Sequence, residues 1–102
     1  MTNQLCLVGR ISEIKEVENH LIVDVIVNRS FKNINGEYDN DIIPVVITGP
    51  MTSSTKEYCQ RGDLIGIRGR IERHINDENS NGYAILQIIA ERVTFLSNKK
   101  AE

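Results

Sequence analysis

The sequence predicts a small all-β domain, a five-stranded barrel with one short helix between the third and fourth strands. Three observations support this fold class. The chain has 102 residues, which is enough for one hydrophobic core but too few for two domains. Apolar residues alternate with polar ones, or form short β-branched runs, in five separate segments. Turn-forming residues separate these segments, and only one stretch has the composition of a helix.

The strands are expected at residues 4–11, 20–27, 41–48, 63–75 and 83–95. The second of these, His-Leu-Ile-Val-Asp-Val-Ile-Val, is rich in β-branched residues that suit a pleated surface. Asn-Ile-Asn-Gly at residues 33–36 and the polar stretch 76–82 contain turn-forming residues, so two hairpins are predicted. Inside the fourth strand, Gly66 and Gly69 indicate a bend or bulge where a small barrel turns its corner.

The single helix is expected at residues 51–60, where a Ser or Thr could cap its start and Gly62 could end it. Three strands, a helix and two further strands is the element order of the OB-fold. This fold is a five-stranded Greek-key barrel that commonly binds oligonucleotides or oligosaccharides. We assign the barrel to residues 1–96 and a short disordered tail to residues 97–102.

Composition and motif content exclude several functional classes. No apolar run approaches the roughly 20 residues of a membrane span, and residues 1–4 do not open a signal peptide, so a cytoplasmic protein without a membrane partner is expected. Cys6 and Cys59 lie far apart without metal-ligand spacing and are expected to be reduced. No catalytic motif is present, so neither enzymatic activity nor a cofactor or metal is expected. The net charge of −2 argues against nucleic-acid binding by bulk positive charge.

Basic residues are nevertheless clustered along the fourth strand. Alternation places Arg68, Arg70 and His74 on the face opposite the isoleucines, where they could follow a phosphate backbone. The alternative is a solvated face with salt bridges, for example between Arg70 and a neighbouring acid. Arg73 falls on the same face as the isoleucines.

A second cluster follows the second strand, where Arg29 and Lys32 flank Phe31. Single-stranded nucleic acid is bound by this combination, because cations contact phosphates while bases stack on the ring. Phe31 could equally be a core residue at the end of the strand. Tyr83, beside the polar stretch 76–82, could stack on a base or cover the rim of the barrel.

Five stretches carry a more specific signal: residues 3–11, residues 27–33 (Val-Asn-Arg-Ser-Phe-Lys-Asn) with Asn-Gly-Glu at 35–37, residues 41–46, residues 58–71 beginning Tyr-Cys-Gln-Arg-Gly-Asp, and residues 90–96. In this order they resemble the bacterial single-stranded DNA-binding protein family over nearly the whole chain. The resemblance implies single-stranded DNA lying on the barrel, its bases stacked on rings and its phosphates held by Arg and Lys. The positions that match this role are Arg10, Arg29, Phe31, Lys32 and Arg70.

The same resemblance implies a homo-oligomer that pairs through its first strand, with a tetramer favoured over a dimer. The interface is expected at Asn3, Leu5 and Leu7. The chain ends at Glu102 without the family's long linker and acidic tip, so either a short form of the family or a trimmed piece of a longer member is expected. The start Met-Thr-Asn also resembles primosomal OB-fold proteins, but residues 28–31 and 58–62 favour the single-strand-binding branch.

The chain departs from the family pattern at its aromatic positions. Thr48 stands where the family usually carries Trp or Phe, and Ile42 replaces a frequent aromatic residue. Asn76 and Ala84 also fall roughly where rings are common. Stacking contributes about 1–3 kcal/mol per base, so DNA binding weaker than is usual for the family is expected.

The sequence therefore predicts a non-catalytic OB-fold protein that binds single-stranded DNA without strong sequence preference and protects it during replication, recombination or repair. A second hypothesis is a primosomal-type or protein-interaction module that kept the barrel but has weak or lost DNA affinity; the missing rings and the slight excess of acids motivate it. The candidate DNA contacts are Arg10, Lys15, Arg29, Phe31, Lys32, Arg68, Arg70, Arg73, His74 and Tyr83.

Overall fold

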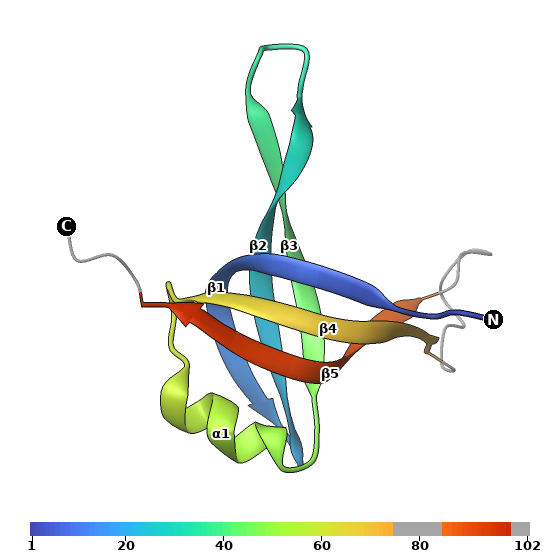
Figure 1. The fold of residues 1–102 in the computed structure, drawn as a ribbon, viewed down its shortest axis with the longest axis vertical. Coiled ribbons are helices and arrows are strands. Elements are labelled where there is room, and N and C mark those ends of the chain that lie inside the picture. Colours follow the sequence, from blue (N-terminus) through green and yellow to red (C-terminus); the bar gives the residue numbers. More distant parts are fainter. Residues whose placement is uncertain (75–84, 99–102) are drawn as a thin grey trace.

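The computed structural model describes residues 1–74 and 85–98, which form a closed five-stranded barrel with one helix (Figure 1). Around the barrel the strand order is β1-β2-β3-β5-β4, and β4 closes the barrel by pairing with β1. All pairs are antiparallel except β3–β5, which is parallel. This is the predicted OB-fold order of elements. The elements are β1 (Leu5–Val17), β2 (His20–Lys32), β3 (Tyr38–Ile47), α1 (Met51–Tyr58), β4 (Leu64–Arg73) and β5 (Leu86–Ser97).

The core is built from alternate residues of each strand, as the sequence pattern predicts. In β2, Leu21, Val23 and Val25 are buried, while the residues between them are partly exposed. In β4, Ile65 and Ile67 are buried in the same alternating way. Burial of each such side chain contributes about 1.5–3 kcal/mol, so this alternation drives strand formation. The other buried aliphatic residues of the core are Ile11, Val45, Ile47 and Ala90.

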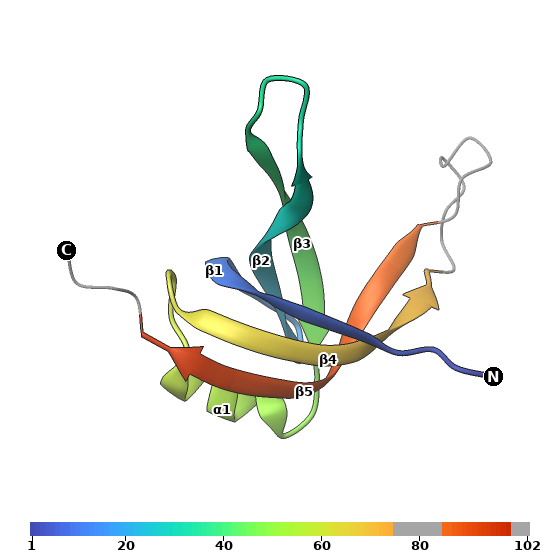
Figure 2. The same ribbon diagram turned by 45° about the horizontal axis from the view of Figure 1, so that its top comes forward.

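The strands β1 and β2 extend furthest beyond their predicted ends. β1 continues past residue 11 because a bulge at Ile11/Glu13 bends it from its pairing with β4 to its pairing with β2. β2 pairs with β1 only as far as Ile26, but its pairing with β3 continues to Lys32, opposite Tyr38. The outer part of the β2–β3 hairpin therefore projects from the barrel (Figures 1 and 2).

The tip of this hairpin is closed by Asn33. Its Oδ1 accepts hydrogen bonds from the backbone N–H groups of Asn35 (2.9 Å) and Glu37 (3.0 Å). Its own N–H donates to the carbonyl of Glu37 at 2.7 Å, and Gly36 has a positive φ of 78°. The predicted turn at residues 33–36 is confirmed, and Asn and Gly are the residues such a turn requires.

The helix α1 is where it was predicted, but the expected caps were wrong. Pro50 is the N-cap residue, and its ring has no side-chain oxygen to cap the helix. Thr52 and Ser53 lie inside the first turn rather than before it. The helix stops at Cys59, which adopts an extended conformation. Gly62 lies beyond the helix, in a loop whose backbone is bonded to Ile11 of β1. α1 is at the end of the barrel opposite the projecting hairpin (Figure 1).

The predicted corner in the fourth strand is confirmed at Gly69. The β4–β5 register shifts between Arg68 and Gly69, and a Cβ at Gly69 would collide with the backbone carbonyl oxygen of Ile89. Only glycine allows the two backbones to approach this closely. Gly66 is different, because a Cβ there would lie 3.7 Å from Cδ1 of Leu96, an ordinary contact.

Several expectations fall outside the described residues: the polar stretch 76–82, the ends of the fourth and fifth strands at 75 and 83–84, and residues 99–102 of the tail. Among the expected site residues this applies to Tyr83. β5 includes Ser97, and the domain boundary at residue 96 stays a prediction. Both cysteines are free, Cys6 exposed and Cys59 buried. The described part of the chain contains no helix long and apolar enough to cross a membrane.

Candidate nucleic-acid interface

The projecting part of the β2–β3 hairpin carries two exposed aromatic rings. Phe31 in β2 is 69% exposed and Tyr38 in β3 is 57% exposed. Phe31 is therefore a surface residue and not part of the core. Rings left in water by the fold can accept a stacked base without any rearrangement of the core.

Lys32 and Tyr38 face each other across this hairpin. They are register partners, and Nζ of Lys32 lies over the tyrosine ring, 5.8 Å from its centroid. This is within the range of a cation–π contact. Sequence reasoning missed Tyr38 because it ended one strand at residue 27 and began the next at residue 41. Extending the pairing outward from the turn at 33–36 would have placed Tyr38 beside the cluster of Arg29, Phe31 and Lys32.

Arg29 forms a two-pronged contact with Asp41 of β3. Its Nε donates to Oδ2 at 3.1 Å and its Nη2 donates to Oδ1 at 3.0 Å. The hydrogen bond to Asp41, together with the charge of that carboxylate, raises the pKa of Arg29. The same bond lowers the pKa of Asp41. Both groups are therefore charged at neutral pH.

Arg70 on β4 forms salt bridges with neighbouring acids, which is the alternative to a phosphate-binding role that the sequence left open. Its Nη2 lies 2.8 Å from Oε2 of Glu72, and its Nη1 lies 3.4 Å from Oε2 of Glu91. Both contacts raise the pKa of Arg70, with the hydrogen bond to Glu72 as the largest cause. Arg68 is exposed, and the side-chain oxygen of Gln4, with its amide correctly oriented, accepts from Nε and Nη2 of Arg68 at 2.8 Å each.

The remaining predicted contacts are spread over other parts of the barrel. Arg10 in β1 donates to the carbonyl of Gly62 at 3.2 Å. Lys15 lies 3.6 Å from Asp24 and 3.9 Å from Glu13. Two others lie at the end of β4: Arg73 is exposed, and His74 is half-buried with its backbone N–H bonded to the carbonyl of Ile85 at 2.7 Å.

The structure thus brings together only some of the predicted DNA-contact residues. Arg29, Phe31 and Lys32 share one hairpin. Alternation along β4 places Arg68 and Arg70 on the outer face and Arg73 on the opposite one. Ile42 and Thr48, two of the positions at which the resemblance leads us to expect rings, are accessible: Ile42 in β3 is 58% exposed, and Thr48 is exposed directly after β3.

The expected oligomer residues lie at the start of the chain. Leu5 and Leu7 are half-buried, and Leu7 packs against the core. The side chain of Asn3 bonds to the backbone of Ile71, donating through Nδ2 at 2.7 Å and accepting through Oδ1 at 3.0 Å. These contacts are within the chain, so the role of the three residues between subunits stays a prediction.

The opposite side of β1 presents apolar groups to solvent. Cys6 and Val8, with Gly66 and Leu96, line a shallow and largely apolar groove of about 290 Å³, to which Leu7, Ile67, Thr94 and Arg68 also contribute. Val8 is 56% exposed. Residues 5–9 pair with β4 on one side only, because pairing with β2 begins at Arg10. The other backbone edge of this segment is open, and Figure 1 shows it at the rim of the β1–β4–β5 layer.

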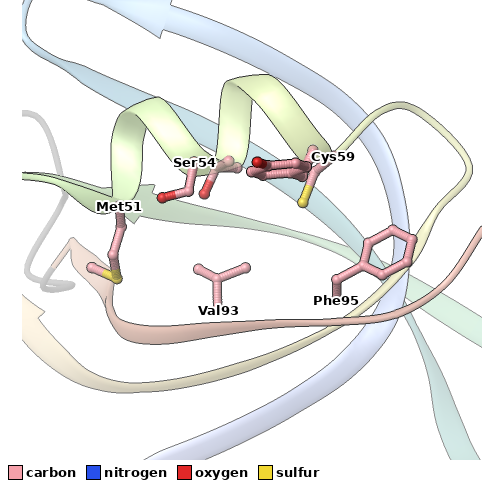
Figure 3. A pocket seen from close by; sticks show the side chains of 7 residues that line it. Met51, Ser54, Cys59, Val93 and Phe95 are labelled. Carbon is pink, nitrogen blue, oxygen red and sulfur yellow. The ribbon is translucent and has the colours of Figure 1, made fainter.

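A second cleft, of about 220 Å³, separates α1 from β5 (Figure 3). Met51, Val93 and Phe95 line it together with Cys59, whose pKa is raised by burial. Among the described residues, no Arg, Lys, Asp or Glu side chain lines this cleft, so it is not suited to phosphate. Within residues 1–74 and 85–98 there is also no cluster of three His, Cys, Asp or Glu side chains that could hold a metal.

The sequence profile of the Single-strand binding protein family matches residues 2–96. The chain belongs to this family. The resemblance seen in the sequence is confirmed, and with it the predicted class of a non-enzymatic DNA-binding protein. The chain is 34% identical over 106 residues to Single-stranded DNA-binding protein 1 of Clostridium acetobutylicum, with 96% of each chain covered. It is 34% identical over 110 residues to Single-stranded DNA-binding protein B of Bacillus subtilis, with 100% of this chain and 96% of the relative covered.

Solved structures of single-stranded DNA-binding proteins share the fold at low sequence identity. The Plasmodium falciparum protein in complex with single-stranded DNA superimposes with a TM-score of 0.70 and 18% identity, covering 95% of this chain and 96% of that chain. The wild-type Thermus aquaticus protein gives a TM-score of 0.75 and 18% identity, covering 96% of this chain and 52% of that chain. These likenesses establish the OB-fold of the chain.

Proposed function

We propose that the chain binds single-stranded DNA without strong sequence preference, with the β2–β3 hairpin as its principal contact. The observation that carries the proposal is the presence of two exposed rings and two cations on one projecting hairpin. Rings stack on any base and cations contact any phosphate, so such a surface needs no particular sequence. The named function of the bacterial relatives supports this proposal.

The affinity is expected to be low for the family. Ile42 and Thr48 are exposed positions that offer no ring to a base. The guanidinium groups of Arg29 and Arg70 are engaged by carboxylates of the same chain. In this account the chain coats single-stranded DNA transiently during replication, recombination or repair in the bacterial cytoplasm.

Fluorescence anisotropy of a labelled oligo-dT, titrated at two salt concentrations, tests the proposal. We expect binding at low salt that weakens as salt rises, with log K falling by about 0.7 per phosphate contact for each unit of log salt concentration. A labelled duplex of the same length serves as the comparison and should bind more weakly. Absence of binding at low salt, or binding independent of salt, would contradict the proposal.

We also propose that the chain is a homo-oligomer, with a tetramer favoured over a dimer. The open backbone edge of residues 5–9 can pair with the same edge of a second copy, because an unpaired strand edge is a template for β-pairing. The exposed apolar groove beside it, which includes Val8, would be covered by the same contact. The contact between subunits would then involve mainly the backbone, and not the side chains, of Asn3, Leu5 and Leu7.

Light scattering of the wild-type chain and of Val8→Lys tests this assembly. Val8 is exposed, so the charge should lower the measured mass without unfolding the chain. Ile34→Lys, at the exposed hairpin tip, is the control that should leave the mass unchanged. Leu7→Asp is a poorer choice, because it would place a charge against the core. A monomeric wild-type chain, or an unchanged mass for Val8→Lys, would argue against the proposed interface.

A protein-interaction module is the second candidate. It is favoured by three carboxylates on the same hairpin, Glu37, Asp39 and Asp41, which repel phosphate. In that case oligo-dT should not bind at low salt, and the oligomer should persist. The anisotropy titration and light scattering together therefore distinguish the two functions.

A further inference from the structure

One of the forked donor pairs that Arg29 could offer to a phosphate is occupied within the chain. Its Nε and Nη2 bind the two carboxylate oxygens of Asp41 at 3.1 and 3.0 Å. This fork geometry is the one by which arginine recognises phosphate as well as carboxylate. One set of parallel donors cannot serve Asp41 and a phosphate at the same time.

We propose that Asp41 is an internal competitor for the phosphate that Arg29 would bind, and that it thereby limits the DNA affinity of the hairpin. The inference rests on the proposed function, because it concerns the same hairpin. When DNA binds, a phosphate displaces the carboxylate, so the contact is exchanged rather than newly formed. The displaced Asp41 then lies close to the DNA backbone and repels it.

The surroundings of the pair favour exchange. The side chains of Arg29 and Asp41 are each 47% exposed, so neither is locked in place by packing. Exposed ion pairs of this kind are weak, and a phosphate carrying a full negative charge can replace the carboxylate. Asp39 also lies close enough to raise the pKa of Arg29, although it accepts its hydrogen bond from Nδ2 of Asn33 at 3.0 Å.

Asp41 could instead assist DNA binding by orienting Arg29, and this role predicts a different effect of removing Asp41. A carboxylate can also hold a guanidinium in the orientation that a ligand needs, leaving its remaining N–H groups for the phosphate. Asp41 would then be a positioning residue, and its removal would weaken DNA binding. The sign of the affinity change therefore separates competition from positioning.

The experiment measures oligo-dT affinity by anisotropy for the full chain with Asp41→Asn, which keeps the shape of the side chain but removes its charge. Because exposed ion pairs are weak, we expect binding tighter by about two- to five-fold. The slope of log K against log salt concentration should also become steeper by up to about 0.7. In Asp41→Asn, the phosphate bound by Arg29 no longer displaces a charged carboxylate. Thermal unfolding of each variant checks that the fold is retained.

Two further variants make the result specific. Asp39→Asn removes the same charge from the same strand and should change the affinity by less than about 1.5-fold, because its hydrogen bond is to Asn33. Arg29→Gln introduced into Asp41→Asn should abolish the gain, since the gain depends on a free guanidinium.

Each outcome decides the inference. Tighter binding by Asp41→Asn alone supports competition. Weaker binding, unchanged binding, or an equal gain in Asp39→Asn overturns it, while binding by the wild-type chain leaves the proposed function intact. If only Asp41→Asn binds oligo-dT, the proposed function fails for the wild-type chain, and competition by Asp41 is supported as the reason for that failure. If neither binds, the proposed function fails and the inference fails with it.

Discussion

Replacement of Phe31 by alanine is the most direct test of the proposed role of the hairpin in DNA binding. Phe31 is 69% exposed, so its ring makes few contacts that stabilise the folded chain. We therefore expect the free energy of unfolding to change by no more than about 0.5 kcal/mol. Loss of one stacked base should cost about 1–3 kcal/mol of binding free energy, which corresponds to about a 5- to 150-fold loss of affinity.

The assay is anisotropy of labelled oligo-dT at low salt, where weak binding can be measured. Phe31→Tyr keeps a ring for stacking and should remain within about two-fold of the wild-type affinity. Ile34→Ala is the matched control, because Ile34 is a fully exposed apolar residue at the tip of the same hairpin but has no ring. Its affinity should stay close to that of the wild-type chain.

A loss of less than two-fold in Phe31→Ala, with the fold intact, would refute the reasoning. It would show that bases do not stack on this ring, and it would favour the protein-interaction module. A large loss in Ile34→Ala as well would also count against stacking, because the effect would then follow from any change in the hairpin surface.

Three more predictions concern the barrel itself. Ile42→Trp adds a ring at an exposed position and should tighten oligo-dT binding by about five-fold or more, whereas unchanged affinity would place Ile42 away from the DNA. Gly69→Ala should lower the free energy of unfolding in urea by about 1–3 kcal/mol because its Cβ meets a backbone carbonyl, while Gly66→Ala should not; equal effects would contradict this account. Ellman's reagent should modify Cys6 in dilute folded protein but spare Cys59, whose burial raises its pKa, and it should modify both in denaturant; equal reactivity in the folded chain would contradict the structure.

The order of the elements could be predicted because the barrel core leaves a clear pattern in the sequence. Leu21, Val23 and Val25 alternate with less buried neighbours, and this period of two is retained in the folded strand. The corner at Gly69 was also visible, since glycine inside a strand indicates close approach of another backbone.

The hairpin extension could not be predicted in this way. Residues 28–32 are mostly polar, and outside the barrel there is no core to impose an alternating pattern. The contact between Arg29 and Asp41 depends on the register across this extension, and so does the position of Tyr38 opposite Lys32. The accessible side of β1 is set by how the strand lies in the closed barrel, so the exposure of Val8 and the packing of Leu7 against the core could not be predicted from the sequence.

The projecting hairpin also has a consequence for how this protein can change over evolution. Phe31, Lys32 and Tyr38 are exposed and lie outside the core cluster, so they can be replaced with little effect on folding. Selection on affinity and selection on stability therefore act on largely different residues. A barrel of this kind can gain or lose affinity for DNA by single substitutions and remain folded throughout. A weak DNA-binding protein can therefore persist and later evolve into a stronger one.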